Sequence, residues 1–372
     1  MRVLHVITGL AAGGAEQSLR DLLRHTRCDA EVVTLTNPGV LAEEIRADGT
    51  PVTDLGMRSN TDLAALPRLT RLIRDGRFDV VHTHLYRAGL FGRLAARRAG
   101  VRTVVATEHS LGEHLIEGRP TDRAGVRALY LGAERLGRMT VAVSPTVVEL
   151  LVRWGVPRRR ITMIPNGIDV ASFRFDATAR RQARARLGIA PGARVLGTVG
   201  RLAPTKRVDL LVEAVAQLPG VVLLVVGDGP ARPELAGLAR RHGIGDRVIF
   251  TGASRDVRGM LSAMDAYASA SPGETFGLSV MEALAAGLPS VYVACPALDD
   301  LPGRVRPGAR RVPAEASALR VAASAALAEP DRLAPPDLPE YDIAHTAAQL
   351  DELYRSLRGT TAEARATVRS RS

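Results

Sequence analysis

The chain has 372 residues, of which 46% are hydrophobic, so it is long enough to form two domains that each bury a core. No uninterrupted apolar run approaches the ~18 residues of a membrane-spanning helix, so we expect no membrane span. Aromatic residues make up only 3%, which argues against a stacking platform for single-stranded nucleic acid and predicts no nucleic-acid partner.

The charge and the cysteine content further limit the class of protein. The formal net charge is +11, yet every basic residue except Lys206 is an arginine. In such a chain, a position occupied by lysine is expected to require a compact ammonium group, because arginine and lysine are not interchangeable at tight sites. Cys28 and Cys295 are far apart and lack metal-ligand spacing, so we expect a reduced, cytoplasmic protein.

The first predicted strand, residues 3–8, leads through a glycine-containing turn into a helix that ends near His25. Gly13 and Gly14 in this turn would let the backbone approach a diphosphate closely. The G-x-G-x-x-G pattern of dinucleotide-binding turns is absent, so a dehydrogenase is disfavoured.

Strands and helices continue to alternate, which predicts a parallel, doubly wound sheet whose ligands gather at the carboxyl ends of the strands. The predicted elements are 30–35, 41–47, 52–54, 62–74, 79–84, 88–98 and 101–107. His82 and His84 lie at one strand end, where we favour a structural role over metal binding because no carboxylate or cysteine partner is evident. The strand at 101–107 brings His109 to the same edge.

Residues 111–138 contain five arginines among apolar residues. One interpretation is an acceptor loop and helix that contact an anionic partner or a membrane surface. The other, a solvated arginine face, is favoured by the composition. The arginines are Arg119, Arg123, Arg127, Arg135 and Arg138.

A domain boundary is predicted near residues 168–190. A strand at 161–164 precedes the turn-rich segment Pro165-Asn166-Gly167-Ile168-Asp169, and residues 170–192 carry no strand pattern. The strand–helix alternation then restarts with a strand at 194–199.

The strand at 194–199 ends in Gly200 and Arg201, and Lys206 lies just before a predicted helix at 208–217. A glycine and two cations at a strand-to-helix turn suit a diphosphate, and we favour this role over the alternative that Arg201 and Lys206 are merely surface cations. Later strands at 221–226, 247–250 and 265–269 are expected to bring the Gly252 loop and the segment after residue 270 to the same edge.

Two glutamates stand out in the segment 271–289, SPGETFGLSVMEALAAGLP. Glu274 lies just before a helix predicted at 277–286, whose free N-terminal amides favour an anion. Glu282 is the only charge in that apolar helix and needs donors such as ribose hydroxyls. The simpler alternative is an acid-capped helix with a salt-bridged Glu282.

Together these motifs, in matching order over about residues 1–290, resemble the retaining glycosyltransferases of family 4, which have the GT-B fold. The shared features are the glycine pair, His109, the Pro-Asn-Gly segment, Gly-Arg-Leu-x-x-x-Lys and Glu-x7-Glu. The resemblance implies two Rossmann-like domains with doubly wound parallel sheets that face a cleft. It places an acceptor domain at 1–168, a donor domain at 169–342, a returning helix at 343–358 and a flexible tail at 359–372.

The resemblance also implies the reaction, which is transfer of a sugar from a nucleoside diphosphate sugar to an acceptor hydroxyl with retention of the anomeric configuration. We expect the donor to be a UDP-sugar and the acceptor to be a small molecule, a glycan or a lipid-linked molecule. His109, Arg201, Lys206 and Glu274 would be catalytic. No Asp-x-Asp occurs, so we expect neither a metal nor a cofactor. The implied nucleotide-sugar contacts are Gly13, Gly14, Asn166, Gly200, Arg201, Lys206, Gly252, Glu274, Thr275, Phe276, Gly277, Leu278 and Glu282.

Two other functions stay open at this point, a nucleotide-sugar epimerase of GT-B architecture and a non-catalytic nucleotide-binding module. The resemblance weakens after Pro289, where residues 290–300 lack the glycine pair usual in relatives. A peripheral contact with the inner face of a membrane is compatible with the basic segment 111–138.

Overall fold

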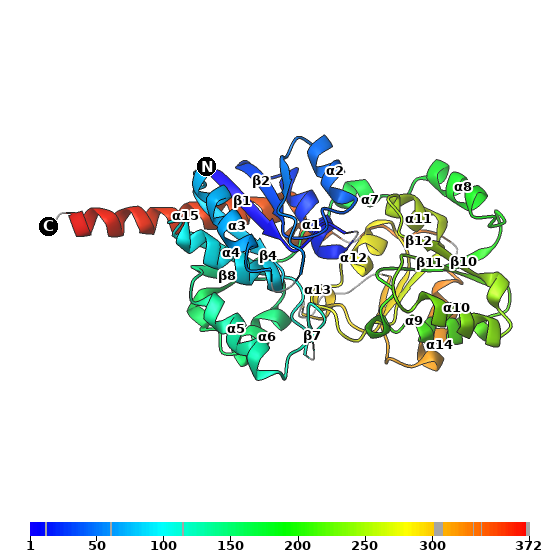
Figure 1. The fold of residues 1–372 in the computed structure, drawn as a ribbon. Coiled ribbons are helices and arrows are strands. Elements are labelled where there is room, and N and C mark those ends of the chain that lie inside the picture. The colour runs from blue at the N-terminus through cyan, green and yellow to red at the C-terminus, as the bar shows by residue number, and fades with distance from the viewer. Residues whose placement is uncertain are drawn as a thin grey trace. The chain divides into compact units, whose positions relative to one another are not determined.

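The computed structural model describes residues 1–11, 13–59, 62–113, 115–300, 308–329, 331–335 and 337–369. The chain divides into two compact units, of which the first is Met1–Gly167 with Pro339–Ser372 and the second is Ile168–Leu338 (Figure 1). The sequence placed these divisions at 168/169 and 342/343. Each unit is an α/β fold around one parallel sheet, as the alternation of elements predicts.

The first unit contains a seven-stranded sheet in the order β3-β2-β1-β4-β5-β8-β9, with every neighbouring pair parallel. Its strands are β1 (Arg2–Ile7), β2 (Asp29–Thr34), β3 (Val52–Asp54), β4 (Val80–His84), β5 (Thr103–Glu108), β8 (Met139–Ala142) and β9 (Ile161–Met163). Its helices before residue 168 are α1 (Gly14–Leu23), α2 (Leu41–Ala47), α3 (Ala65–Asp75), α4 (Tyr86–Arg98), α5 (Ala124–Glu134) and α6 (Pro145–Arg153). The short strands β6 (Leu115–Ile116) and β7 (Arg119–Pro120) form a separate antiparallel pair.

Side chains alternate between the two faces of this sheet, so each face carries its own core. On one face Leu4 and Val81 pack with residues of α3 and α4. On the other face Val3 and Val80 pack with α1 and with the last helix. Burial on both faces explains why the central strands read as nearly continuous apolar runs.

The last helix, α15 (Ile343–Arg369), belongs to the first unit. In Figure 1 the orange-red start of this helix lies behind the blue and cyan elements of that unit, and its red end extends beyond them. Its buried Ile343, Leu350 and Tyr354 join the core beneath the sheet. A Cβ on Gly167 would meet the Ile343 backbone at 2.5 Å, so glycine allows the helix to lie close.

The last helix is longer than predicted, while the flexibility of residues 359–372 stays a prediction. The helix continues past the predicted end at residue 358 as far as Arg369, because alanine, glutamate and arginine in this segment favour helix. Residues 370–372 lie outside the described residues.

The second unit contains a six-stranded parallel sheet in the order β12-β11-β10-β13-β14-β15. Its strands are β10 (Arg194–Val199), β11 (Val221–Val226), β12 (Val248–Gly252), β13 (Ala266–Ser269), β14 (Ser290–Tyr292) and β15 (Ala309–Arg311). Its helices are α7 (Val170–Phe173), α8 (Ala177–Arg186), α9 (Val208–Ala216), α10 (Arg232–Arg241), α11 (Val257–Ala263), α12 (Leu278–Ala285), α13 (Pro296–Asp299) and α14 (Ala316–Ala326). Leu223, Leu211 and Leu319 are among its fully buried core residues.

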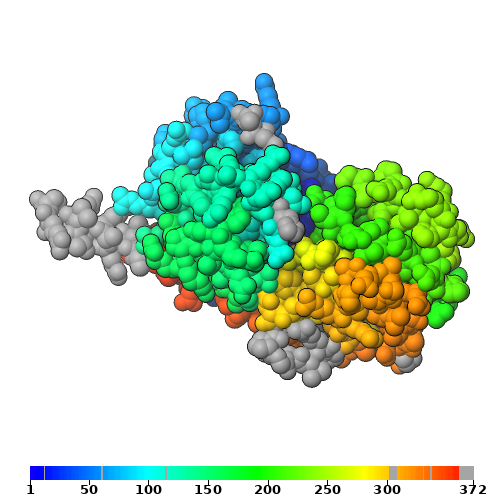
Figure 2. Space-filling view, turned by 90° about the horizontal axis from the view of Figure 1, so that it is seen from below, coloured from blue at the N-terminus to red at the C-terminus, as the bar shows by residue number. Residues whose placement is uncertain are grey.

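Helices α5 and α6 form a broad outer face of the first unit, drawn in green in Figure 2. Arg123, Arg127, Arg135 and Arg138 are all exposed. Their exposure fits the solvated arginine face, while contact with an anionic partner or a membrane stays a prediction. Within the described ranges, no helix has both the length and the hydropathy of a membrane span.

Candidate active site

Hydrogen bonds between backbone groups of glycine loops connect the carboxyl ends of β10, β11 and β12 in the second unit. Gly200 follows β10 and its N–H donates to the carbonyl of Val226 at 3.0 Å, and the N–H of Gly227 donates to the carbonyl of Gly252 at 3.0 Å. A Cβ on Gly227, where φ is 136°, would collide with the carbonyl oxygen of Gly200. The turn that carries Arg201 is therefore fixed against the end of β12. Arg201 itself is exposed.

Lys206 and Glu274 are in direct contact although 68 positions separate them. Lys206 ends a short 3-10 turn (Pro204–Lys206) before α9, and Glu274 lies in the loop after β13. The Lys206 Nζ donates to Glu274 Oε1 at 2.6 Å, and the side chains are 32% and 17% exposed. The only lysine of the chain thus meets the first glutamate of the Glu-x7-Glu pair at the edge of the sheet where we expected a diphosphate.

Tyr267 on β13 connects the two glutamates electrostatically. Burial raises the pKa of its hydroxyl above the ordinary range, and the charges of Glu274 and Glu282 raise it further. The Ser279 hydroxyl and the Val199 backbone oppose this increase. Both carboxylates therefore act on one buried phenol.

Tyr267 was not predicted as a site residue, although an aromatic residue in the otherwise small-residue strand AYAS is a usable signal in a chain with few aromatics. Glu282 was predicted to be a charge inside an apolar helix, and in the structure its residue is partly exposed.

The N-terminus of α12 lies next to this pair of glutamates in the chain. Gly277 begins the helix with φ 98°, and a Cβ there would meet Cys295 Sγ at 2.5 Å, so the position requires glycine. No side chain caps the helix. Phe276 is buried and its carbonyl accepts from the Ala297 N–H at 2.9 Å, which anchors the loop. Thr275 and Leu278 on either side stay partly exposed, so the helix N-terminus is accessible to an anion.

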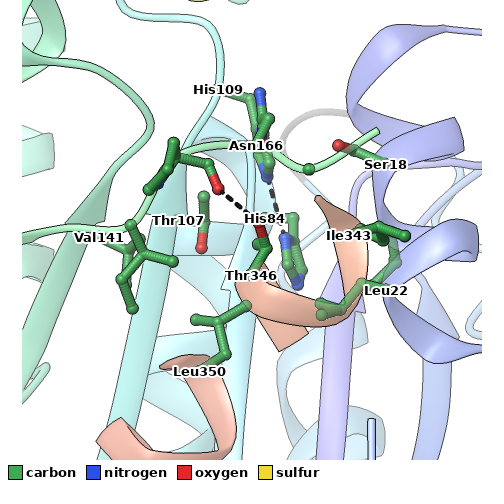
Figure 3. A pocket seen from close by; sticks show the side chains of 14 residues that line it. Ser18, Leu22, His84, Thr107, His109, Val141, Asn166, Ile343, Thr346 and Leu350 are labelled. Carbon is green, nitrogen blue, oxygen red and sulfur yellow. Dashed lines mark hydrogen bonds between the residues drawn. The ribbon is translucent and has the colours of Figure 1, made fainter. Parts of the chain in front are cut away.

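In the first unit, His109 follows β5 and lines a small cavity of about 20 Å³, which has room for about one water molecule (Figure 3). Asn166 and His84 lie beside it, and Ser18 of α1 approaches from the opposite side. Burial lowers the pKa of His109 to about 4, so the imidazole is neutral near pH 7.

The predicted glycine pair opens α1, with Gly13 at the N-cap and Gly14 as the first helical residue. The carboxylate of Glu16 lies against Gly13. A negative side chain at this helix N-terminus competes with a phosphate for the same amides. Ala12, inside this turn, lies outside the described residues.

His82 has the structural environment that the sequence favoured. Its Nδ1 is 2.5 Å from the Tyr354 hydroxyl and its Nε2 is 2.7 Å from the Thr107 hydroxyl. Among the described residues, His5, His82 and His84 form a group whose ring nitrogens lie within 4.8 Å of one another, a spacing that a metal ion could use.

Each unit thus carries its own part of the predicted site. The second unit gathers Gly200, Arg201, Lys206, Gly252, Glu274, Thr275, Phe276, Gly277, Leu278 and Glu282 along one edge of its sheet. The first unit places Gly13, Gly14, His109 and Asn166 at the corresponding edge of its own sheet.

Two known protein families match successive parts of the chain. Residues 12–172 match the family described as Glycosyltransferase Family 4, and residues 179–306 match Glycosyl transferases group 1. The chain is 32% identical over 329 residues to a D-inositol 3-phosphate glycosyltransferase of Actinosynnema mirum, covering 82% of this chain and 77% of that protein. A protein of the same name from Mycobacterium marinum is 32% identical over 324 residues, covering 82% and 67%.

The solved structure of Anabaena HepE in complex with UDP-glucose superposes with a TM-score of 0.76 at 22% identity, covering 99% of this chain and 100% of that chain. This likeness establishes the fold as GT-B. With both family matches and relatives that align over most of their length, the chain belongs to glycosyltransferase family 4 and is a glycosyltransferase.

Proposed function

We propose that this enzyme transfers a sugar from a UDP-sugar to a hydroxyl of a small-molecule acceptor, with retention of anomeric configuration and without a metal ion. HepE, which shares the fold, binds UDP-glucose, which supports the choice of donor. The sequence relatives are glycosyltransferases of D-inositol 3-phosphate, so a phosphorylated cyclitol is the first acceptor to test.

The contact between Lys206 and Glu274 is the observation on which the proposal depends. It places an ammonium and a carboxylate next to each other at the carboxyl edge of the second sheet. A diphosphate bound there would be stabilised by Lys206, by Arg201 and by the amides at the N-terminus of α12. Glu274 would then accept hydrogen bonds from sugar hydroxyls, and Glu282 would accept them from the ribose.

The proposed reaction needs no charge from a metal. The bond between the anomeric carbon and the diphosphate oxygen breaks, and a bond from the acceptor oxygen to that carbon forms on the same face. The proton of the acceptor hydroxyl passes to the departing diphosphate. Negative charge that develops on the diphosphate is stabilised by groups already in place, which lowers the barrier electrostatically. In this scheme the neutral imidazole of His109 contacts the donor sugar.

A thermal-shift screen of UDP-, GDP- and dTDP-sugars tests the donor, because a ligand that binds only the native state raises its melting temperature. The UDP-sugars are expected to give the largest shift. Product analysis then follows transfer to inositol phosphate in the presence of EDTA, which should leave turnover unchanged. Interconversion of UDP-sugars without any acceptor would indicate an epimerase instead, and a preference for GDP- or dTDP-sugars would reject the proposed base.

A further inference from the structure

Histidine side chains cluster on one face of the sheet in the first unit. His5 on β1 and His82 on β4 are paired in register, and His84 lies two residues further along β4, on the same face. His5, His82 and His84 are each at most 2% exposed. The interior of a parallel sheet is normally aliphatic, so buried imidazoles at its centre need a physical explanation.

Two of these rings, His5 and His84, form a hydrogen-bonded chain with His109, and we call these three residues the imidazole row. His5 Nδ1 lies 3.0 Å from His84 Nε2, and His84 Nδ1 lies 3.2 Å from His109 Nε2. Figure 3 shows the second of these contacts, with His109 standing above His84.

The rings of the row lie end to end. The ring centroids are 5.3 and 5.5 Å apart and the ring planes differ by 27° and 25°. These separations match the nitrogen–nitrogen distances plus the ring radii, so the rings are nearly coplanar and not stacked face to face. Each contact therefore has the geometry of an N–H···N hydrogen bond.

The rings are also uncharged near pH 7. Burial lowers the pKa of His5 and of His109 to about 4, and it lowers the pKa of His84 well below its usual value. A neutral imidazole has one N–H donor and one acceptor nitrogen. His84 can therefore donate to one neighbour only if it accepts from the other, and all three rings must carry their proton on the same type of nitrogen.

We infer that His84 is a positioning residue which, through the imidazole row, fixes the tautomer and the orientation of His109. This inference rests on the proposed function, in which His109 meets the donor sugar. His5 forms the far end of the row. The tautomer of each ring in the row determines the tautomer of the next. The buried rings of His5 and His84 therefore decide whether Nδ1 of His109 is a hydrogen-bond donor or an acceptor.

His82 provides a matched control because it is buried beside the row without belonging to it. Its ring centroid lies 4.3 Å from that of His84, but its two nitrogens are bonded to the hydroxyls of Tyr354 and Thr107. A metal ion held by His5, His82 and His84 is the rival explanation. It would have to displace one of those hydroxyls from His82.

Two substitutions of His84 separate the two ends of the row. The amide of asparagine takes the place of Nδ1 and that of glutamine takes the place of Nε2. His84→Asn therefore keeps a partner for His109, whereas His84→Gln keeps one for His5 only. We expect His84→Gln to lower kcat up to about a hundredfold, the loss caused by misplacing a reacting group by about 1 Å. His84→Asn should retain most of the activity, and both should leave KM for the donor nearly unchanged.

His82→Gln should lower the melting temperature and leave kcat close to wild type, because it disturbs the same core without removing a hydrogen bond of the row. Equal losses of kcat in His84→Asn and His84→Gln, at equal melting temperatures, would show that His84 only fills space and would overturn the inference.

Nuclear magnetic resonance of the wild-type protein with ¹⁵N-labelled histidine tests the row without any substrate. At pH 7 His5, His84 and His109 should be neutral and share one tautomer, and opposite tautomers within the row would overturn the inference. This measurement uses no donor or acceptor. It can therefore contradict the inferred hydrogen-bonded row even if the proposed function is correct, and it can support the row even if the proposed function is wrong. Titration with Co²⁺ should give no visible absorption band. A band that His84→Gln abolishes would establish a metal site in place of the row.

Discussion

The ammonium of Lys206 donates to the carboxylate of Glu274 across 68 positions of sequence, at a distance of 2.6 Å. Both side chains keep some exposure, so the pair adds at most about 1 kcal/mol to folding. Its value to the molecule lies in holding a cation and an anion at the carboxyl edge of the second sheet.

Replacing Lys206 should therefore damage transfer far more than stability. We expect Lys206→Ala to lower kcat by about 10²–10³, as removal of a group that stabilises developing charge does. Lys206→Arg should recover only part of the activity because the planar guanidinium does not reproduce the compact ammonium. Initial rates and urea unfolding measure the two effects. Arg186→Ala, which breaks an exposed ion pair with Asp256 in the same unit, serves as the control and should leave both unchanged.

Glu274 and Glu282 should separate into two kinetic phenotypes. Glu282→Gln is expected to weaken binding of UDP itself by about tenfold, or about 1.4 kcal/mol, because the ribose loses a charged acceptor. Glu274→Gln should bind UDP as wild type does but lose sugar transfer. Calorimetric titration with UDP and a transfer assay distinguish the two. Wild-type turnover of Glu274→Gln would remove this residue from the reaction.

Gly277 should tolerate no side chain. Its φ of 98° and the nearby Cys295 Sγ mean that Gly277→Ala adds backbone strain and a steric clash, at a cost of about 1–3 kcal/mol. Gly273→Ala in the same loop is the control, since no atom lies within 4 Å of a Cβ there. Chemical unfolding measures both, and equal stability of the two variants would contradict the geometry of the loop.

The hydroxyl of Tyr354 should contribute to stability through His82. Tyr354→Phe removes the partner of a fully buried ring nitrogen, so we expect a loss of about 1–3 kcal/mol. A double-mutant cycle with His82→Gln isolates the contact, because the combined loss should be smaller than the sum of the two single losses. Strict additivity would mean that the contact contributes nothing.

Stability should fall in mild acid because of buried His5. Burial lowers its pKa from 6.5 to about 4, an effect that the charge of Asp351 partly opposes. Between these two values the unfolded chain binds a proton that the folded chain excludes, so unfolding becomes more favourable as the pH falls through this range. The expected slope from this residue is about 1.4 kcal/mol per pH unit. Urea unfolding from pH 7 to pH 4 measures the total slope, to which His109, whose pKa burial also lowers to about 4, contributes as well. His5→Asn should reduce this slope by the contribution of His5.

Local patterns in the sequence were enough to predict both parallel sheets and the loops at their carboxyl ends. Lys206 and Glu274 were found from composition and spacing, because each lies at a strand-to-helix turn of a recognisable kind. β14 and β15 were missed, whereas β3 and β9, which also have three residues each, were predicted.

Contacts between distant strands were beyond those patterns. His5 reads locally as an interruption of an apolar strand, and its partner His84 becomes visible only when β1 and β4 are paired in register. Tyr267 did carry a local signal, but its relation to Glu282 depends on how α12 packs next to β13.

The return of α15 to the first unit has a consequence for the order of folding during synthesis. Residues 343–354 complete the core that covers the histidine face, and Tyr354 supplies a hydrogen-bond partner for His82. The ribosome must therefore synthesise the whole second unit before the core of the first unit can be completed. The second unit, in contrast, can fold as soon as its own residues have been synthesised. A nascent chain that stops at residue 338 would contain the whole second unit together with a first unit whose histidine face is still uncovered.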